Sequence, residues 1–289
     1  MRQQLFLLIF GFFSLLDAKV SIYSHYFGQP EFIKYQYLFF KQNLLDEYEF
    51  IVFEDSNNPK ISEEIRKECE IYGIKYIHIP CSVFEKPKLT ITHPSITINA
   101  PSFQCSVAIQ YIYDTYIMHS ENICLILDND IFLLSPFSIE KSLGDSSFSY
   151  LRQQREKGNQ SICYMLPNFI FFNPPIMPAK ERLNFNMGSI LEIFTDAGGY
   201  TYFYLQDYGF LGKEMTQYYL FNTSSNLKIR FGDQYPLLFN SKEWLSHYFI
   251  EPDTFLHLRM GSNWSHHSKY TQMREELDAF FQELLKEVF

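Results

Sequence analysis

The segment Cys124–Phe132 has the sequence Cys-Leu-Ile-Leu-Asp-Asn-Asp-Ile-Phe, an apolar run that ends in two carboxylates, Asp128 and Asp130, one residue apart. A buried strand that leads into such a pair is typical of open α/β sheets, which bind ligands at the carboxyl ends of their strands. The alternative is an ordinary turn after a strand, because Asp and Asn both favour turns. The segment therefore predicts an α/β fold with a candidate ligand site at the end of this strand.

The two carboxylates of this segment are unfavourable neighbours. At a separation of roughly 5 Å and an effective dielectric constant near 20, two such groups repel each other by about 3 kcal/mol. A fold that keeps both ionised is therefore expected to bind a cation between them. Oxygen ligands favour a hard divalent ion, Mg²⁺ or Mn²⁺, which keeps some of its waters and bridges to phosphate. The pair thus indicates a ligand that carries a diphosphate group.

The chain of 289 residues is acidic, with a formal net charge of -9 and a pI near 5.4. Its length is enough for one large α/β domain or two small ones. Nucleic acid is not expected as a partner, because binding to its phosphate backbone requires clustered Lys and Arg. The five cysteines are odd in number and lack the spacing of a zinc site. We expect them to be buried, reduced thiols without a metal or redox role.

Residues 1–18 are similar to a targeting segment, with Arg2 before an apolar run from Leu5 to Leu16 and Ala18 at the cleavage position. The run is shorter than the roughly 20 apolar residues that span a bilayer. The alternatives are a signal peptide, an uncleaved short membrane anchor, and an amphiphilic start that packs on the domain. A targeting role would make the protein secretory, or associated with a membrane through its N-terminus. Without that role the protein would be cytoplasmic.

From Lys19 onward, strands and helices alternate as they do in a βαβ sheet. Three strands with intervening helices precede the strand that ends at Asp128, so we expect this strand near the middle of the sheet, where the strand order switches. The expected strands are Val20–Tyr26, Glu49–Glu54 and Ile74–Ile79, and the expected helices are Glu31–Asn43, Ser62–Tyr72 with Ser62 as its N-cap, and Ser102–His119, with a loop over 85–101.

Beyond Pro136 the pattern is less regular and predicts a smaller, mixed C-terminal part. No internal repeat or linker interrupts the chain, so we expect one domain over residues 19–289. The expected elements of this part are strands at Phe148–Leu151 and Phe169–Asn173, a helix at Tyr200–Gln206 and a closing helix at Thr271–Val288.

This ordered set of elements resembles a GT-A type glycosyltransferase with a DxD motif, the fold that moves a sugar from a nucleotide-diphosphate donor. The resemblance covers about Val20–Trp264 and includes a late histidine, His257, in the pattern His-x-x-x-Gly-x-x-Trp. It implies that Asp130 binds the metal directly, that Asp128 contacts the metal or the donor ribose, and that His257 completes the metal shell. A hydrogen-bonded structural histidine is the alternative for His257.

The resemblance also implies residues that bind the donor. Asp55 would contact the base or ribose of the nucleotide, and the Asn186-x-Gly188 element would place an amide and bare backbone against the donor sugar. The Lys-Pro of the related retaining family is absent here, and Arg259 could supply the cation to the diphosphate instead, because a guanidinium matches phosphate geometry. The alternatives are a solvated loop acid, a simple turn and a surface arginine. The late motif is one residue longer than in the related retaining family and lacks its Lys-Pro, so retention of the anomeric configuration does not follow.

A reaction that inverts the anomeric configuration needs a carboxylate base to deprotonate the acceptor hydroxyl. Asp196, which precedes Gly198-Gly199 and the start of a helix, is the first candidate, and an N-cap aspartate is the alternative. Asp233, in Gly-Asp-Gln, is the second candidate and could equally orient the sugar hydroxyls from a loop.

The sequence therefore predicts a GT-A fold enzyme that depends on Mn²⁺ or Mg²⁺ and uses a nucleotide sugar and a glycan, lipid or protein acceptor. Two other functions stay open. One is a non-catalytic protein that binds sugar nucleotides or glycans on the same fold. The other is a phosphohydrolase with an Asp128 nucleophile, although Phe132 stands where that family has Thr or Val.

Overall fold

The computed structural model describes residues 19–87, 100–220, 225–240, 248–251, 253–258 and 270–286. Arg259 and Trp264 lie outside these residues, as do most of the expected loop over 85–101 and the whole of the expected targeting segment. Among the described residues, no helix is both long enough and apolar enough to cross a membrane.

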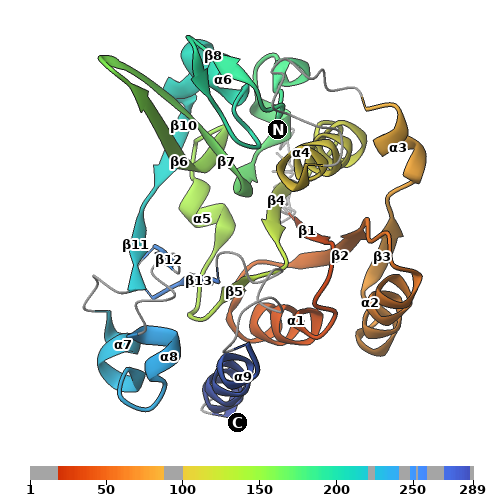
Figure 1. The fold of residues 1–289 in the computed structure, drawn as a ribbon, viewed down its shortest axis with the longest axis vertical. Helices are drawn as coiled ribbons and strands as arrows, with labels where there is room; N and C mark the ends of the chain where they lie inside the picture. Colours follow the sequence, from red (N-terminus) through yellow and green to blue (C-terminus); the bar gives the residue numbers. More distant parts are fainter. Residues whose placement is uncertain are drawn as a thin grey trace, which may run out of the picture.

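A seven-stranded sheet forms the centre of the molecule, and β4 is its middle strand (Figure 1). Strands β3, β2, β1 and β4 are parallel neighbours, while β7 runs antiparallel to both β4 and β6. The expected mostly parallel sheet with the Asp128 strand at its centre is therefore confirmed. In spatial order the strands are β10 (Gly212–Met215), β6 (Phe148–Lys157), β7 (Gln160–Phe172), β4 (Ile123–Asp128), β1 (Val20–Tyr26), β2 (Tyr48–Glu54) and β3 (Lys75–His78).

Helices cover both faces of this sheet because successive strand residues point to opposite sides. Ile22 belongs to the apolar cluster that includes α1 (Phe32–Asn43), α2 (Pro59–Tyr72) and α9 (Tyr270–Lys286). Tyr23 belongs to a second cluster, formed with α4 (Pro101–Ile112) and α6 (Thr201–Tyr208). Figure 1 shows α1 and α4 on opposite sides of the strands. The sheet is thus buried on both faces, which explains the continuous apolar runs of its parallel strands.

A second, smaller sheet begins directly after the carboxylate pair. Its order is β11 (Gln217–Tyr219), β12 (Tyr248–Ile250), β13 (Phe255–His257) and β5 (Ile131–Leu133), and its pairs are antiparallel. The expected smaller C-terminal part is only partly separate, because β11, β12 and β13 form this sheet with β5, whereas β6, β7 and β10 from the same region beyond Pro136 belong to the large sheet. The Asp128–Asp130 turn therefore joins the two sheets, and side chains from both can reach it.

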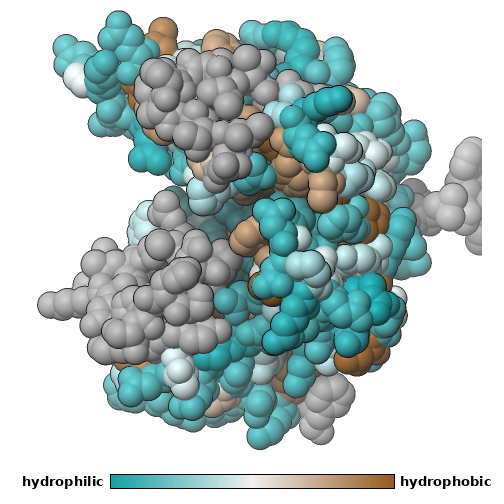
Figure 2. Space-filling model, turned by 45° about the vertical axis from the view of Figure 1, so that its right-hand side comes forward, coloured by the Kyte–Doolittle hydropathy of each residue, from teal (hydrophilic) through white to brown (hydrophobic). Residues whose placement is uncertain are grey.

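The remaining elements are short and lie around these two sheets. A deep indentation divides one face of the molecule (Figure 2). The short elements are α3 (Cys81–Glu85), the π-helical turn Tyr113–Ile117 after α4, α5 (Ile139–Leu143), α7 (Asn226–Phe231), α8 (Pro236–Phe239), the hairpin β8 (Ser189–Ile190) and β9 (Ile193–Phe194), and 3-10 turns at Pro174–Ile176, Lys180–Arg182 and Gly209–Leu211.

Several expected element boundaries are wrong. Helix α2 begins at Pro59, with Asn58 rather than Ser62 as its N-cap, because the Asn58 side chain accepts a hydrogen bond from the Lys60 amide and proline suits the first helical turn. Ser62 instead donates its hydroxyl to the buried Glu54. Strands β6 and β7 are also much longer than expected. The outer half of β6 is exposed and polar and carries no apolar pattern, whereas in β7 a proline, Pro167, interrupts the apolar run that begins at the buried Ile162.

One buried amide connects α1 to the carboxylate turn. Gln36 Oε1 accepts hydrogen bonds from the hydroxyls of Ser24 (2.9 Å) and Tyr26 (2.8 Å). Its Nε2 donates to the carbonyl oxygens of Asp128 and Ile131, both at 2.9 Å. Gln36 therefore holds the backbone on both sides of the turn against the end of β1.

Replacing Gln36 by leucine is expected to lower the free energy of unfolding by about 2–4 kcal/mol, because an unsatisfied buried polar group costs about 1–3 kcal/mol. Chemical denaturation measures this loss. The matched control is Gln154→Leu on the exposed part of β6, which should change the free energy by less than about 0.5 kcal/mol. Equal losses in the two variants would contradict the role assigned to Gln36.

Candidate metal and nucleotide site

The carboxylate of Asp130 and the imidazole of His257 lie side by side. Asp130 Oδ1 is 3.3 Å from His257 Nε2, and both side chains are at most 5% exposed. The contact follows from strand pairing, because His257 on β13 lies opposite Ile131 on β5 and the Leu258 amide donates to the Asp130 carbonyl oxygen at 2.9 Å. On the other side of the ring, His257 Nδ1 is 2.5 Å from the hydroxyl of Tyr248. Tyr248 thus fixes the ring with Nε2 toward Asp130.

Asp128 ends β4, two residues before Asp130. The amide of Asn168, on the neighbouring strand β7, donates a hydrogen bond to its carboxylate. Burial, and next the negative charge of Asp130, raise the pKa of Asp128 to about 6, while His25, His257 and Asn168 act in the opposite direction. Without a cation, these two neighbouring groups therefore disfavour the fully ionised state.

The residue between the two acids also holds the turn in place. Asn129, between the two acids, donates its amide to the carbonyl oxygen of Gly28 at 3.0 Å. Together with the hydrogen bonds of Gln36, this bond holds the turn against the loop between β1 and α1. The donor set of Asp128, Asp130 and His257 comprises two carboxylates and one imidazole, which suits Mn²⁺ and, less closely, Mg²⁺.

A second group of side chains lies on the other side of Asp128. His25 is the register partner of Asp128 on the parallel strand β1, and its Nε2 is 3.1 Å from Asp55 Oδ1. Burial opposes protonation of His25, but the carboxylate of Asp55 outweighs it and raises the pKa of His25 well above its usual range. Cys105 on α4 also faces His25, and burial raises the pKa of its thiol to about 11.

The candidates Asn186, Gly188 and Asp196 come together in one compact turn. The Gly188 carbonyl oxygen accepts a hydrogen bond from the Thr195 amide, and the Asn186 carbonyl oxygen accepts one from the Tyr200 amide. The turn packs on β7 just before Asn168. Gly198 adopts a φ of +82°, and a Cβ there would lie 2.7 Å from the Met165 carbonyl oxygen. This residue must therefore be glycine for the turn to approach β7.

The other candidates are separate from this arrangement. Asp233 is exposed between α7 and α8, a region that packs on α9 through a hydrogen bond from Gln234 to Glu283. Asp55 is buried against His25, and a polar pocket of about 400 Å³ begins at the next residue. This pocket is lined by Ser56, Asn57, Pro59, Ser62, Glu63, Arg66, Tyr76, His78 and Cys81. The roles of the candidates Asp55, Asn186, Gly188, Asp196 and Asp233 stay predictions.

Three residues near Asp128 were not candidates in the sequence: His25, Cys105 and Asn168. His25 could have been found, because it lies one residue before the end of the first strand and Asp128 ends the fourth, and adjacent parallel strands bring such positions together. No sequence pattern indicates that Cys105 lies near Asp128, because this proximity depends on where α4 crosses the sheet. The expectation that the cysteines are buried is confirmed for Cys69 and Cys124 and wrong for Cys81, which is exposed, and for Cys105 and Cys163, which are partly buried.

Solved structures to which the chain is similar include several glycosyltransferases. The apo form of GlyE from Streptococcus pneumoniae TIGR4 is 10% identical, with a TM-score of 0.44, and the similarity covers 94% of this chain and 62% of GlyE. For the galactosyltransferase LgtC, in complex with donor and acceptor sugar analogs, the identity is 11%, the TM-score 0.34, and the coverage 67% of this chain and 66% of LgtC.

The core-mannan synthase CmsA/Ktr4 from Aspergillus fumigatus, in its Mn/GDP form, is 12% identical, with a TM-score of 0.34 and coverage of 53% of this chain and 59% of that one. The chain thus spans about three fifths of the length of GlyE and CmsA. No family model and no curated protein sequence matches the chain. The likeness concerns the arrangement of sheet and helices.

The raised pKa of Asp128 makes ion binding dependent on pH. In the folded protein Asp128 keeps its proton to a higher pH than in the unfolded chain, so its contribution to stability decreases as pH rises from about 4 to about 6. A divalent ion must displace this proton. At a Mn²⁺ concentration of about 100 times the Kd at pH 7, we expect the ion to raise the melting temperature by on the order of 5 °C at about pH 7. The same concentration should raise it less at about pH 5.

Thermal melts with and without Mn²⁺ at the two pH values measure this effect. In Asp128→Asn the increase should be small and should not change with pH. An increase that is equal at both pH values in the parent protein would contradict the assignment of Asp128 as a ligand.

Proposed function

We propose that this chain is a metal-dependent glycosyltransferase that moves a sugar from a nucleotide-diphosphate donor to an acceptor hydroxyl. The observation that supports the proposal most strongly is the set of Asp128, Asp130 and His257 at the junction of two sheets. Gln36 holds the backbone of the turn, Tyr248 holds the His257 ring beside Asp130, and two carboxylates and an imidazole are donors that suit Mn²⁺ or Mg²⁺. When bound, the ion would stabilise the negative charge that develops on the departing diphosphate.

The remaining residues have roles around the sugar and the acceptor in this proposal. Asn186 and Gly188 orient the donor sugar from the turn over β7, and Asp55 binds the nucleoside. Asp196, in the same turn, takes the proton of the acceptor hydroxyl if the reaction inverts the anomeric configuration. Its amide donates to the Tyr164 hydroxyl at 3.3 Å, which connects this turn to β7. Arg259 remains a candidate for the diphosphate.

The acceptor class is the least specified part of the proposal. A glycan, a lipid or a protein hydroxyl would each suit the chemistry, and membrane association would come from residues 1–18. A binding protein without turnover would keep the ion-dependent affinity for a nucleotide sugar and lack sugar transfer. A phosphohydrolase would instead release phosphate from a simple ester with Asp128 as its nucleophile.

Calorimetric titration with nucleoside diphosphates tests the ion site. In the presence of Mn²⁺ we expect the parent protein to bind one of them, and Asp130→Asn to lose affinity by roughly 100-fold, because removal of a charged ligand removes the bridge to the diphosphate. The matched control is Asp207→Asn, whose carboxylate forms an exposed ion pair with Arg182, and it should bind as the parent does. Binding that is as tight without any divalent ion would contradict the proposal.

Sugar transfer can be separated from binding with the two base candidates. We expect Asp196→Asn to lower kcat for release of nucleoside diphosphate from a nucleotide sugar by about 100-fold or more while KM for the donor stays similar, because a general base contributes about 10²–10⁴ to the rate. Asp233→Asn serves as the matched comparison. If Asp233→Asn lowers kcat and Asp196→Asn does not, the base is Asp233. If the parent protein releases no nucleoside diphosphate over a panel of donors and acceptors, the result favours a binding protein without turnover.

A further inference from the structure

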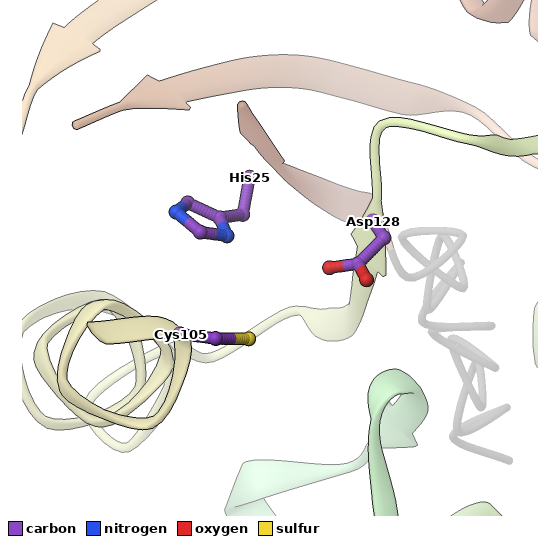
Figure 3. A group of neighbouring side chains, drawn as sticks. All are labelled: His25, Cys105 and Asp128. Carbon is purple, nitrogen blue, oxygen red and sulfur yellow. The ribbon is translucent and has the colours of Figure 1, made fainter. Parts of the chain in front are cut away.

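Three side chains from three separate elements converge beside the proposed Mn²⁺ site. His25 comes from β1, Cys105 from α4 and Asp128 from β4, and one ligand atom of each lies within 4.8 Å of the other two. Figure 3 shows one ring nitrogen of His25, the Cys105 sulfur and the Asp128 carboxylate turned toward a common space. The three residues are far apart in the sequence, so the fold alone brings them together.

The second ring nitrogen of His25 lies in ion-pair contact with a buried carboxylate. Nε2 is 3.1 Å from Asp55 Oδ1, and both side chains are less than 10% exposed. A carboxylate on the far side of an imidazole fixes the ring orientation and raises the basicity of the nitrogen that faces the ion. The arrangement of Asp55, His25 and the common space is therefore that of a carboxylate–histidine–metal group.

The donor set differs in chemistry from that of the proposed Mn²⁺ site. Imidazole nitrogen, thiolate sulfur and carboxylate oxygen together suit Zn²⁺, whereas hard ions such as Mg²⁺ and Mn²⁺ avoid thiolate. Zn–N and Zn–S bonds of about 2.0 and 2.3 Å require ligand atoms somewhat closer than 4.8 Å. We expect the Cys105 and Asp128 side chains to rotate slightly when the ion binds.

We propose that His25, Cys105 and Asp128 bind Zn²⁺, or a transition-metal ion of the same ligand preference, with Asp55 orienting the imidazole. The S–H bond of Cys105 and the N–H bond on the His25 nitrogen that faces the common space break, both protons leave to the solvent, and a metal–sulfur and a metal–nitrogen bond form. Three protein ligands leave a fourth position for water or another small ligand. Because Asp128 belongs to both sites, Zn²⁺ here would oppose Mn²⁺ binding; this consequence rests on the proposed function.

Competition with a chromogenic zinc chelator tests the site directly. We expect Cys105→Ala to bind Zn²⁺ roughly 100-fold more weakly than the parent protein, since loss of a direct ligand costs at least as much as loss of an outer partner, at 10–100-fold. The matched control is Cys81→Ala, because Cys81 is an exposed thiol outside the cluster, and it should bind as the parent does. Equal zinc affinity in the parent and Cys105→Ala overturns the proposal.

Two further measurements keep the result interpretable. The parent loaded with Co²⁺ should show a thiolate-to-cobalt charge-transfer band that Cys81→Ala keeps and Cys105→Ala lacks; no such band in the parent overturns the site. In the parent protein, Zn²⁺ should raise the Mn²⁺ concentration that is needed for nucleoside diphosphate binding. In Cys105→Ala it should not. If Zn²⁺ has no such effect on the parent, Asp128 is not shared between the two sites. In Asp130→Asn the zinc site should persist, so failure of the proposed function is seen separately.

Discussion

The repulsion between Asp128 and Asp130 is the constraint around which this structure is arranged. The two carboxylates lie at the end of the central strand β4, with Asp130 4% exposed, where water screens charge poorly. The chain then passes at once into the second sheet, which brings His257 within 3.3 Å of Asp130. A divalent cation would convert this repulsion into attraction and would leave coordination positions for a diphosphate.

The surrounding fold holds this turn from several directions. Gln36 binds its backbone carbonyl oxygens, Asn129 connects it to the β1–α1 connection, and Asn168 holds the Asp128 carboxylate from β7. Such support fixes the ligands before an ion arrives, so binding does not have to order them. The same convergence of strand ends brings His25 and Cys105 to Asp128, which explains how a second, softer donor set arises beside the first.

The apolar strands β1, β2 and β4 could be predicted from the sequence because strands buried on both faces of a parallel sheet are continuous apolar runs. The outer half of β6 could not, because Arg152–Lys157 is largely exposed and carries no apolar pattern. The outer half of β7 could not, because Pro167 interrupts its apolar run. In the site, the Asp128–Asp130 pair was visible in the sequence as a local motif. The pairing of His25 with Asp55 and the approach of Cys105 depend on strand register and helix placement, which single-sequence patterns do not encode.

The most direct measurement of the central claim is a crystal structure with Mn²⁺ and a nucleoside diphosphate, with anomalous diffraction recorded at the manganese absorption edge. The anomalous peak should lie between the carboxylates of Asp128 and Asp130 and His257 Nε2, with a diphosphate oxygen in its coordination shell. A peak elsewhere, or a nucleotide bound with these three side chains uninvolved, would contradict the claim.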